Sequence, residues 1–266
     1  MPELPDVEGF KRYFARHASG RRVRWVDVRA ADIVRNTTPR GLAGALKGRR
    51  LAKPRRHGKW MIVPVGDDRD DRGPAVLFHF GMTGGLRWVG GDGGEPHAHD
   101  RVVLGLDGGE LRYRNMRKLG GVWLARTGQP IAEVTGTLGP DAQSVSCEDL
   151  DELLVRRRGG LKAALMNQRV IAGIGNELSD EILWQARLNP RRVPSRLRSP
   201  DRDRLHRVMQ EVIAESNRHG LIPRKRGWIS SQRGKRDGQC PRCGRRLRRE
   251  TVAGRTAYWC PRCQRG

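Results

Sequence analysis

The chain has 266 residues, enough for two domains or for one domain with small modules. Lys and Arg total 53 against 29 Asp and Glu, and this excess, a formal net charge of +24, runs along the whole chain. So basic a folded protein favours a polyanion, nucleic acid first, because a merely solvated surface would mix the two signs more evenly. No apolar run approaches the roughly 18 residues of a membrane span, and no cleavable signal peptide is recognisable. We therefore expect a cytoplasmic protein without a membrane partner.

The chain begins Met-Pro-Glu-Leu-Pro-Asp-Val-Glu, and removal of Met1 would make Pro2 the N-terminus. The secondary amine of Pro2 would then be partly neutral near pH 7, as α-amino groups are. Such an amine can attack a carbonyl carbon and form an iminium. Glu3, beside it, is a candidate general acid or base. The alternative is that a proline at this position is simply tolerated and has no chemical role.

A helix and a series of short strands are expected next. Val7, Phe10 and Phe14 recur at helical spacing, which predicts a helix that follows Pro5 and ends near Gly20. Strands are predicted at 22–28, 61–65, 75–80, 86–89, 101–106, 110–114 and 121–124. The turn sequence at 107–109, Asp-Gly-Gly, is a strong hairpin signal. This pattern predicts a sandwich or barrel, with a charged exposed loop at 67–73.

From about residue 131 the apolar period becomes helical. Four helices are predicted: one capped by Ser146, one from 162 to 166, one after the Gly-Ile-Gly at 173–175, and one with five apolar residues between 205 and 213. Residues 187–200 are rich in Arg and Pro and are expected to form a loop. Residues 222–238 are basic and poor in apolar side chains, which predicts a linker or mobile loop.

The last 28 residues contain a metal-binding pattern. Two Cys-Pro-Arg-Cys pairs are separated by sixteen residues, a spacing that fits a tetrahedral zinc site on a β-hairpin in a reducing compartment. The expected ligands are Cys240, Cys243, Cys260 and Cys263. Four thiolates leave no open coordination position, so this single Zn²⁺ should be structural, and so small a module needs it to fold. Five arginines between the pairs suit contact with phosphates.

Three further segments carry candidate contact residues. At 173–176, Gly-Ile-Gly-Asn, the glycines and the following helix start could admit a phosphate, with Asn176 donating its amide or capping the helix. Lys59 precedes a strand and is either a phosphate anchor or acid, or a solvated strand end. His97, His99 and Asp100 could suggest metal ligands but lack further converging ligands, so phosphate contact or packing is the favoured interpretation. The basic run 112–118 is either a solvated strand or a DNA-facing edge.

Four motifs in this order resemble one family. They are the opening octapeptide, His-Phe-Gly-Met-Thr-Gly at 79–84, Ala-Gly-Ile-Gly-Asn-Glu at 172–177, and the four-cysteine hairpin ending Cys-Gln-Arg. Together they resemble the formamidopyrimidine-DNA glycosylase / endonuclease VIII (Fpg/Nei) family of base-excision repair enzymes, over essentially the whole chain. The family architecture is an N-terminal β-sandwich, a helix-two-turn-helix domain and a zinc finger.

The resemblance implies a role for individual residues. Pro2 would be the nucleophile at the sugar C1′, and Glu3 the acid/base partner in base departure and ring opening. Lys59 would assist β-elimination and hold phosphate, and Arg255 would serve δ-elimination and phosphate binding. Asn176 would grip the DNA backbone. The resemblance also implies DNA contacts by His99, Lys118, Arg158 and Lys162, and filling of the space left by the extruded base by Met82, Arg117 and Leu119.

The sequence departs from the family pattern at several points. Asp6 replaces a usual glutamate, and Asn-Met-Arg-Lys-Leu at 115–119 stands where 8-oxoguanine enzymes commonly have Asp-Pro-Arg-Arg-Phe. Residues 222–238 are short where those enzymes often carry a longer lesion-covering loop. The Glu-Leu-Pro opening is similar to the formamidopyrimidine branch, whereas Tyr-Trp-Cys-Pro at 258–261 is similar to endonuclease VIII. The preferred damaged base therefore stays open.

We accordingly predict an α+β multidomain fold: an N-terminal catalytic β-sandwich with a leading helix (1–130), a helix-two-turn-helix DNA-binding domain (131–225), and a linker loop with a zinc finger (226–266). The predicted activity is that of a bifunctional DNA glycosylase and AP lyase. It would be monomeric and nucleoid-associated, and would act on damaged double-stranded DNA with one structural zinc. A non-enzymatic zinc-ribbon DNA-binding protein and an AP lyase with little glycosylase activity are the alternatives.

Overall fold

The computed structural model describes residues 2–66, 73–91 and 93–265, and the chain forms two compact units. The first unit contains Pro2 and Val7–Thr137, and the second contains Glu3–Asp6 together with the chain from Leu138 onward. Four residues from the start of the chain thus pack with its second half. All of the predicted loop at 67–73 except Gly73 lies outside the described residues.

The leading helix is present as α1 (Leu4–His17), and its first turn is fixed by Asp6. The Glu3 N–H donates to Asp6 Oδ2 at 2.8 Å, which is the second half of a capping box. Burial raises the pKa of Asp6, and this hydrogen bond opposes the rise. Val7 and Phe14 are fully buried, as the helical spacing predicted.

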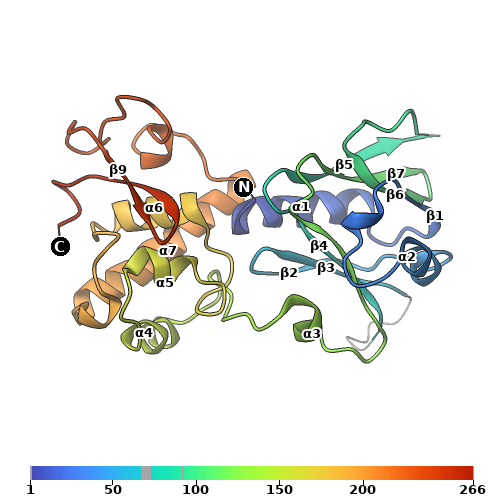
Figure 1. Ribbon diagram of the computed structural model, residues 1–266, viewed down its shortest axis with the longest axis horizontal. Helices are drawn as coiled ribbons and strands as arrows, with labels where there is room; N and C mark the ends of the chain where they lie inside the picture. Colours follow the sequence, from blue (N-terminus) through green and yellow to red (C-terminus); the bar gives the residue numbers. More distant parts are fainter. Residues whose placement is uncertain (1, 67–72, 92, 266) are drawn as a thin grey trace. The chain divides into compact units, whose positions relative to one another are not determined.

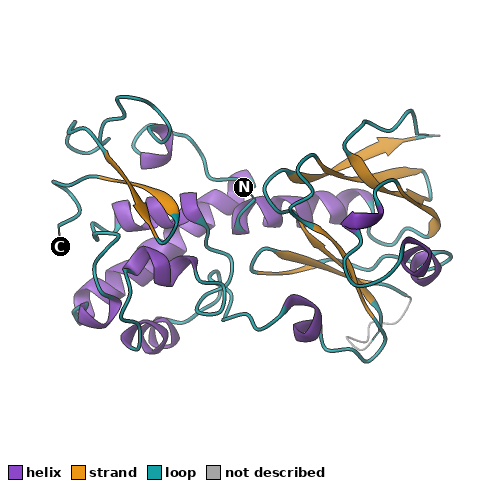
Figure 2. Ribbon diagram, viewed as in Figure 1, coloured by secondary structure: helices purple, strands orange, loops and turns teal. Residues whose placement is uncertain are grey.

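The first unit is a two-layer antiparallel sandwich, which confirms the predicted architecture (Figure 2). One sheet has the order β1 (Val23–Val28), β6 (Asp100–Leu106), β7 (Gly109–Asn115), β5 (Gly84–Gly90). The other has the order β2 (Arg55–His57), β3 (Trp60–Pro64), β4 (Ala75–His79), β8 (Gly121–Ala125). Apolar side chains of both sheets and of α1 share one core, which includes Phe14, Phe78 and Leu104.

Three features of this unit differ from the sequence prediction. Helix α2 (Pro39–Leu46) and strand β2 were not predicted, although Thr38-Pro39 is a helix-start signal: Thr38 Oγ1 accepts the Gly41 N–H at 3.0 Å. Strand β7 lies inside its sheet between β6 and β5, so residues 112–115 do not form an edge strand, and contact of 112–118 with DNA stays a prediction. Arg112 is buried against Glu110, and only the residues after Asn115 leave the sheet.

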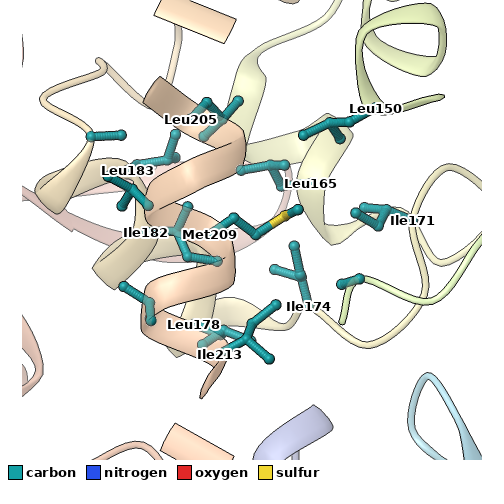
Figure 3. Packing of buried hydrophobic residues seen from close by; sticks show 14 of the residues in the cluster. Leu150, Leu165, Ile171, Ile174, Leu178, Ile182, Leu183, Leu205, Met209 and Ile213 are labelled. Atoms are coloured by element: carbon teal, nitrogen blue, oxygen red, sulfur yellow. The ribbon is translucent and has the colours of Figure 1, made fainter. Parts of the chain in front are cut away.

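The second unit is helical, with a core built around α7. Its helices are α4 (Cys147–Val155), α5 (Leu161–Met166), α6 (Asn176–Gln185) and α7 (Ser199–His219), whereas the short α3 (Ile131–Thr135) belongs to the first unit. Met209 of α7 packs among leucine and isoleucine side chains of α5 and α6 (Figure 3). Ser146 Oγ accepts the Asp149 N–H at 3.0 Å, which confirms the predicted cap.

The same unit ends in the hairpin β9 (Arg248–Val252) and β10 (Arg255–Trp259), coloured red in Figure 1. Ala253 and Gly254, both with positive φ, form its two-residue turn. The linker interpretation of 222–238 is wrong for its middle part, because Trp228 and Ile229 are buried and Ser230 N–H donates to Glu181 at 2.9 Å. The expected loop at 187–200 contains a 3₁₀ turn (Pro194–Arg196), and α7 begins at its end.

No helix within the described ranges is long and apolar enough to cross a membrane.

Candidate active site and zinc centre

The Glu3 carboxylate occupies the N-terminus of α6. Glu3 is 1% exposed, and its two oxygens accept the N–H groups of Gly175, Glu177 and Leu178 at 2.8–3.0 Å. These N–H groups have no partner inside the helix, and the helix dipole places positive charge there. The helix start that was expected to admit a phosphate is thus occupied by the protein's own Glu3 carboxylate. The chain is thereby fixed immediately beside Pro2.

The two glycines before α6 make room for this arrangement. A Cβ on Gly175 would lie 2.3 Å from Glu3 Cδ, and one on Gly173 would lie 2.6 Å from Leu4 Cδ1. Gly173 also has φ +112° and accepts the Leu4 N–H at 3.1 Å. The close approach that these glycines permit is thus made by the N-terminal segment.

Asn176 is the first helical residue of α6 and does not cap the helix. The N-cap residue is Gly175, which has no side chain that could make a capping hydrogen bond. Asn176 Oδ1 is buried and has no hydrogen-bond partner among the described residues. The capping interpretation of Asn176 is therefore wrong. The buried Oδ1 can only accept a hydrogen bond, so contact with a phosphate oxygen would fall to the side-chain amide N–H and stays a prediction.

Lys162 is buried, with a side chain that is 0% exposed. Its Nζ donates to the Asn176 carbonyl at 3.0 Å and pairs with Asp180, which also pairs with Arg233 and accepts the Tyr258 N–H at 3.1 Å. Burial lowers the pKa of Lys162 and raises that of Asp180, and their mutual attraction opposes both shifts. Because its side chain is fully buried, Lys162 does not reach a DNA phosphate in this conformation, so the predicted direct DNA contact is not supported. Neither Asp180 nor Arg233 was singled out in the sequence, because no local pattern links four separate segments.

Lys59 lies in the first unit, in the turn between β2 and β3, where Gly58 has φ +56°. It is partly exposed and lies close to His79 of β4. Burial and the positive charge of Lys59 lower the pKa of His79 to about 4, so this imidazole is neutral at neutral pH. Its Nδ1 accepts the Gly81 N–H at 3.2 Å and thereby shapes the turn that carries Met82.

Two adjoining turns of the first unit carry the residues expected to fill the vacated base position. Met82 and Leu119 are 41% and 56% exposed, and Arg117 Nη1 lies 3.6 Å from Met82 Sδ. The turns touch directly, because a Cβ on Gly81 would lie 2.6 Å from the Leu119 carbonyl carbon. Single exposed apolar side chains are common, whereas exposed apolar side chains on adjoining segments are typical of interaction sites. Met116, which was not predicted, is 52% exposed on the same segment.

The remaining predicted contact residues lie on four separate segments of the chain. Lys118 has φ +52° and pairs with Asp32 at 3.1 Å, an exposed ion pair that a phosphate could replace. His99 is partly exposed and lies 3.3 Å from Arg101. Arg158 is exposed in the turn between α4 and α5, and Arg255 is exposed at the tip of the zinc hairpin.

The four predicted cysteine ligands converge. A tetrahedral Zn²⁺ with Zn–S bonds of about 2.3 Å requires sulfur atoms about 3.8 Å apart. Cys240 and Cys263 Sγ are 3.9 Å apart, and Cys243 and Cys260 Sγ are 3.6 Å apart. This centre holds one structural zinc. Trp184 of α6 donates its indole N–H to Cys240 Sγ at 3.3 Å and so joins the centre to the helical core. Elsewhere in residues 2–66, 73–91 and 93–265, no other group of His, Cys, Asp or Glu converges in this way.

Family models match the chain in three consecutive parts. Residues 1–122 match the N-terminal domain of formamidopyrimidine-DNA glycosylase, 138–223 its helix-two-turn-helix domain, and 239–266 a zinc finger found in FPG and IleRS. The sandwich, the helical domain and the zinc hairpin therefore match, in order, the three parts of a DNA-repair glycosylase. This chain belongs to the formamidopyrimidine-DNA glycosylase family, whose members are base-excision repair enzymes that combine glycosylase and AP lyase activities.

Known relatives match along the full length. Formamidopyrimidine-DNA glycosylases of Stenotrophomonas maltophilia and Salinispora arenicola are 35% and 33% identical, with 100% and 99% of this chain and 100% and 96% of the relative covered. The Lactococcus lactis enzyme, solved in complex with DNA containing N7-benzyl-Fapy-dG, has a TM-score of 0.88 at 27% identity, with both chains fully covered. Another structure of that enzyme, bound to DNA with an AP site, has a TM-score of 0.87 at 26% identity, again over both whole chains.

Loss of one zinc ligand is expected to unfold the hairpin and leave the sandwich and the helical core folded, because the module has almost no core of its own. Cys260→Ser or chelation should remove the bound zinc, weaken DNA binding and change the fluorescence of Trp184. Zinc content, circular dichroism and binding titrations measure these effects. Cys147→Ser, a cysteine of α4 outside the centre, is the matched control and should retain one zinc per chain. Equal DNA affinity with and without metal would contradict a structural role in binding.

Proposed function

We propose that Pro2 and Glu3 carry the chemistry of this glycosylase and AP lyase. The observation that supports this assignment is the buried Glu3 carboxylate, which three backbone N–H groups fix next to the N-terminal proline. If Pro2 were simply tolerated, there would be no reason for the next residue, Glu3, to be held by the N-terminus of α6, which is 172 residues away in the sequence. Removal of Met1 leaves the Pro2 secondary amine as the nucleophile, and Glu3 as the group that exchanges protons with the reacting sugar.

The reaction is a displacement followed by eliminations. The Pro2 nitrogen forms a bond to C1′ as the damaged base leaves with the glycosidic electrons, and cleavage of the C1′–O4′ bond then gives an iminium. The iminium acidifies the C2′ proton, so its removal expels the 3′-phosphate. The reaction either stops at this β-elimination or continues by a δ-elimination that expels the 5′-phosphate, and in both cases water releases the sugar fragment and regenerates Pro2. We propose that Lys59 supports the first elimination and Arg255 the second.

The substrate in this proposal is damaged double-stranded DNA with an extruded base. Extrusion costs a few kcal/mol, least at a damaged pair, and the exposed Met82, Arg117 and Leu119 would occupy the vacated space. His99, Lys118, Arg158 and Asn176 would hold the backbone, whereas Lys162, being buried, would act through the Asn176 carbonyl instead of on a phosphate.

The proposal also covers domain limits, assembly and location. The limits 1–130, 131–225 and 226–266 are supported by family-model matches with gaps between them at 123–137 and 224–238. A monomer suffices, because the chain supplies every group in the proposed reaction. A nucleoid-associated location follows from the net charge of +24. An AP lyase with little glycosylase activity is distinguished by nicking assays on duplexes with 8-oxoguanine, formamidopyrimidine, oxidised pyrimidine or an abasic site.

Covalent trapping tests the nucleophile. Borohydride added during reaction with abasic DNA should reduce the iminium and leave a stable crosslink on Pro2, located by peptide mass spectrometry. Pro2→Gly keeps an N-terminal amine and should retain some trapping, whereas a variant that keeps Met1 should give none. A crosslink on a lysine would refute the assignment of Pro2.

Glu3→Gln should slow base release by about 10²–10⁴-fold in single-turnover assays, the usual contribution of a general acid or base. DNA affinity should stay nearly intact. In this variant the new side-chain NH₂ would replace one carboxylate oxygen and face a backbone N–H group, so that this buried donor loses its acceptor. The loss should lower the free energy of unfolding by about 1–3 kcal/mol. Glu177→Gln removes a partly exposed carboxylate from the same helix start and is the matched control, with near-normal rate expected. Full glycosylase activity in Glu3→Gln would overturn its catalytic role.

The phosphate grip is tested by salt titration, because each neutralised phosphate releases condensed counterions. Arg158→Ala should lower the slope of log affinity against log salt by about one unit, for damaged and intact DNA alike. Asn176→Ala should weaken binding with little change in slope, since Asn176 is neutral. Arg207→Ala, an exposed arginine of α7, controls for net charge and should leave the slope unchanged. An unchanged slope in Arg158→Ala would contradict the assignment of Arg158 to a phosphate contact, and it would leave the catalytic assignments untouched.

A further inference from the structure

The buried carboxylate of Asp180 joins the parts of the second unit that carry proposed DNA-contacting and catalytic groups. Asp180 is 2% exposed and lies in the middle of α6. One of its oxygens pairs with Lys162 of α5, and the other pairs with Arg233 and accepts the Tyr258 N–H of β10. Side chains and backbone from four separate segments therefore meet on one carboxylate.

From Asp180, a short path leads to the Glu3 cradle. Lys162 spans the distance, because its Nζ also donates to the Asn176 carbonyl at 3.0 Å. Asn176 stands between Gly175 and Glu177, whose N–H groups hold the Glu3 carboxylate. The negative charge of Glu3 is also close enough to act on Lys162 electrostatically.

In the other direction, the path leads to the zinc hairpin. Tyr258 pairs with Arg249 across the hairpin and lies two residues before the ligand Cys260. The Arg233 guanidinium is 4.9 Å from the centre of the Tyr258 ring and donates to the Thr256 carbonyl at 3.4 Å. β10 therefore contacts Asp180 directly and through Arg233.

A stabilising role alone does not account for this arrangement. Burying an ion pair costs desolvation that its attraction often fails to recover, and an apolar replacement of similar volume is frequently as stable. What a fully satisfied buried network supplies is a single geometry for the groups it joins. Glu181, the next residue, is equally buried, yet it accepts the Ser230 N–H and reaches neither Lys162 nor the hairpin.

We propose that Asp180 is a positioning residue that couples the zinc hairpin to the Asn176 turn and, through that turn, to the Glu3 carboxylate. Zinc then has a second effect besides folding the hairpin: it sets the order of the backbone that holds the catalytic carboxylate. The link to catalysis rests on the proposed function, whereas the coupling itself is a property of the folded chain.

The coupling is tested by hydrogen exchange on the full-length protein, with and without chelation of zinc by EDTA. In the wild type, chelation should speed exchange of the amides at 173–178 about tenfold or more, because the local opening free energy of the turn falls. Asp180→Asn with zinc bound should show the same faster exchange, and chelation should then add little. Such non-additivity identifies one shared path, whereas two independent structural effects would multiply.

Two matched variants keep the test decisive. Glu181→Gln alters a neighbouring buried carboxylate outside the path and should keep the wild-type response to chelation. Asp180→Asn/Lys162→Gln removes both charges of the pair, so it avoids an uncompensated buried lysine and serves if Asp180→Asn alone does not fold. Slow exchange at 173–178 in zinc-loaded Asp180→Asn would overturn the proposal; if only the double variant folds, the same result in that variant would do so. Effects of the substitution and of chelation that multiply would also overturn it.

Catalysis is then measured separately with abasic DNA. Asp180→Asn should lower the single-turnover strand-cleavage rate by about tenfold at saturating enzyme, a loss that tighter binding conditions do not recover. An unchanged rate with coupled exchange would remove Asp180 from the reaction and overturn its role as a positioning residue. If the wild type itself neither excises nor cleaves, the proposed function fails, while the exchange experiment still decides the coupling.

Discussion

The rest of the structure depends on the insertion of the Glu3 carboxylate at the start of α6. Free N–H groups at a helix start need an acceptor, and a buried carboxylate needs donors. Each requirement is met by the other, with three N–H groups on two oxygens. The contact fixes the position of the residue beside Pro2 without help from the sandwich. A nucleophile at a chain terminus would otherwise lie on the most mobile part of a protein.

The same constraint explains why the Gly-Ile-Gly motif has its composition. A side chain at Gly175 would overlap Glu3, and one at Gly173 would overlap Leu4. The motif therefore serves the protein's own N-terminus before it serves any phosphate. Asn176 does not cap the helix, where Glu3 accepts the free N–H groups, and its own buried Oδ1 has no hydrogen-bond partner among the described residues. One helix terminus thus positions both a proposed catalytic group and a proposed backbone contact.

Sequence reasoning reached the features that local patterns determine. Alternation and turn residues predicted the strands of the sandwich except β2, together with the 107–109 hairpin. Helical spacing predicted α6 and α7, and cysteine spacing predicted the zinc centre. Contacts between distant segments left no local signal. Lys162 resembles any basic surface residue in a chain with 53 Lys and Arg, and only the fold brings it to Asp180. The buried Trp228–Ser230 turn was likewise missed because its anchor, Glu181, lies on another element.

The positively charged side chains of this protein fall into two groups, one exposed to solvent and one buried and paired with a carboxylate. Exposed cations such as Arg158 and Arg255 are free of desolvation cost and suit a salt-sensitive, sequence-independent hold on phosphates. Lys162 is buried and Arg233 is largely buried, and both pair with the carboxylate of Asp180. A buried cation without that carboxylate would cost far more than the pair contributes. The excess of positive charge that indicates a nucleic-acid partner therefore includes a smaller internal network, in which Asp180 pairs with Lys162 and Arg233.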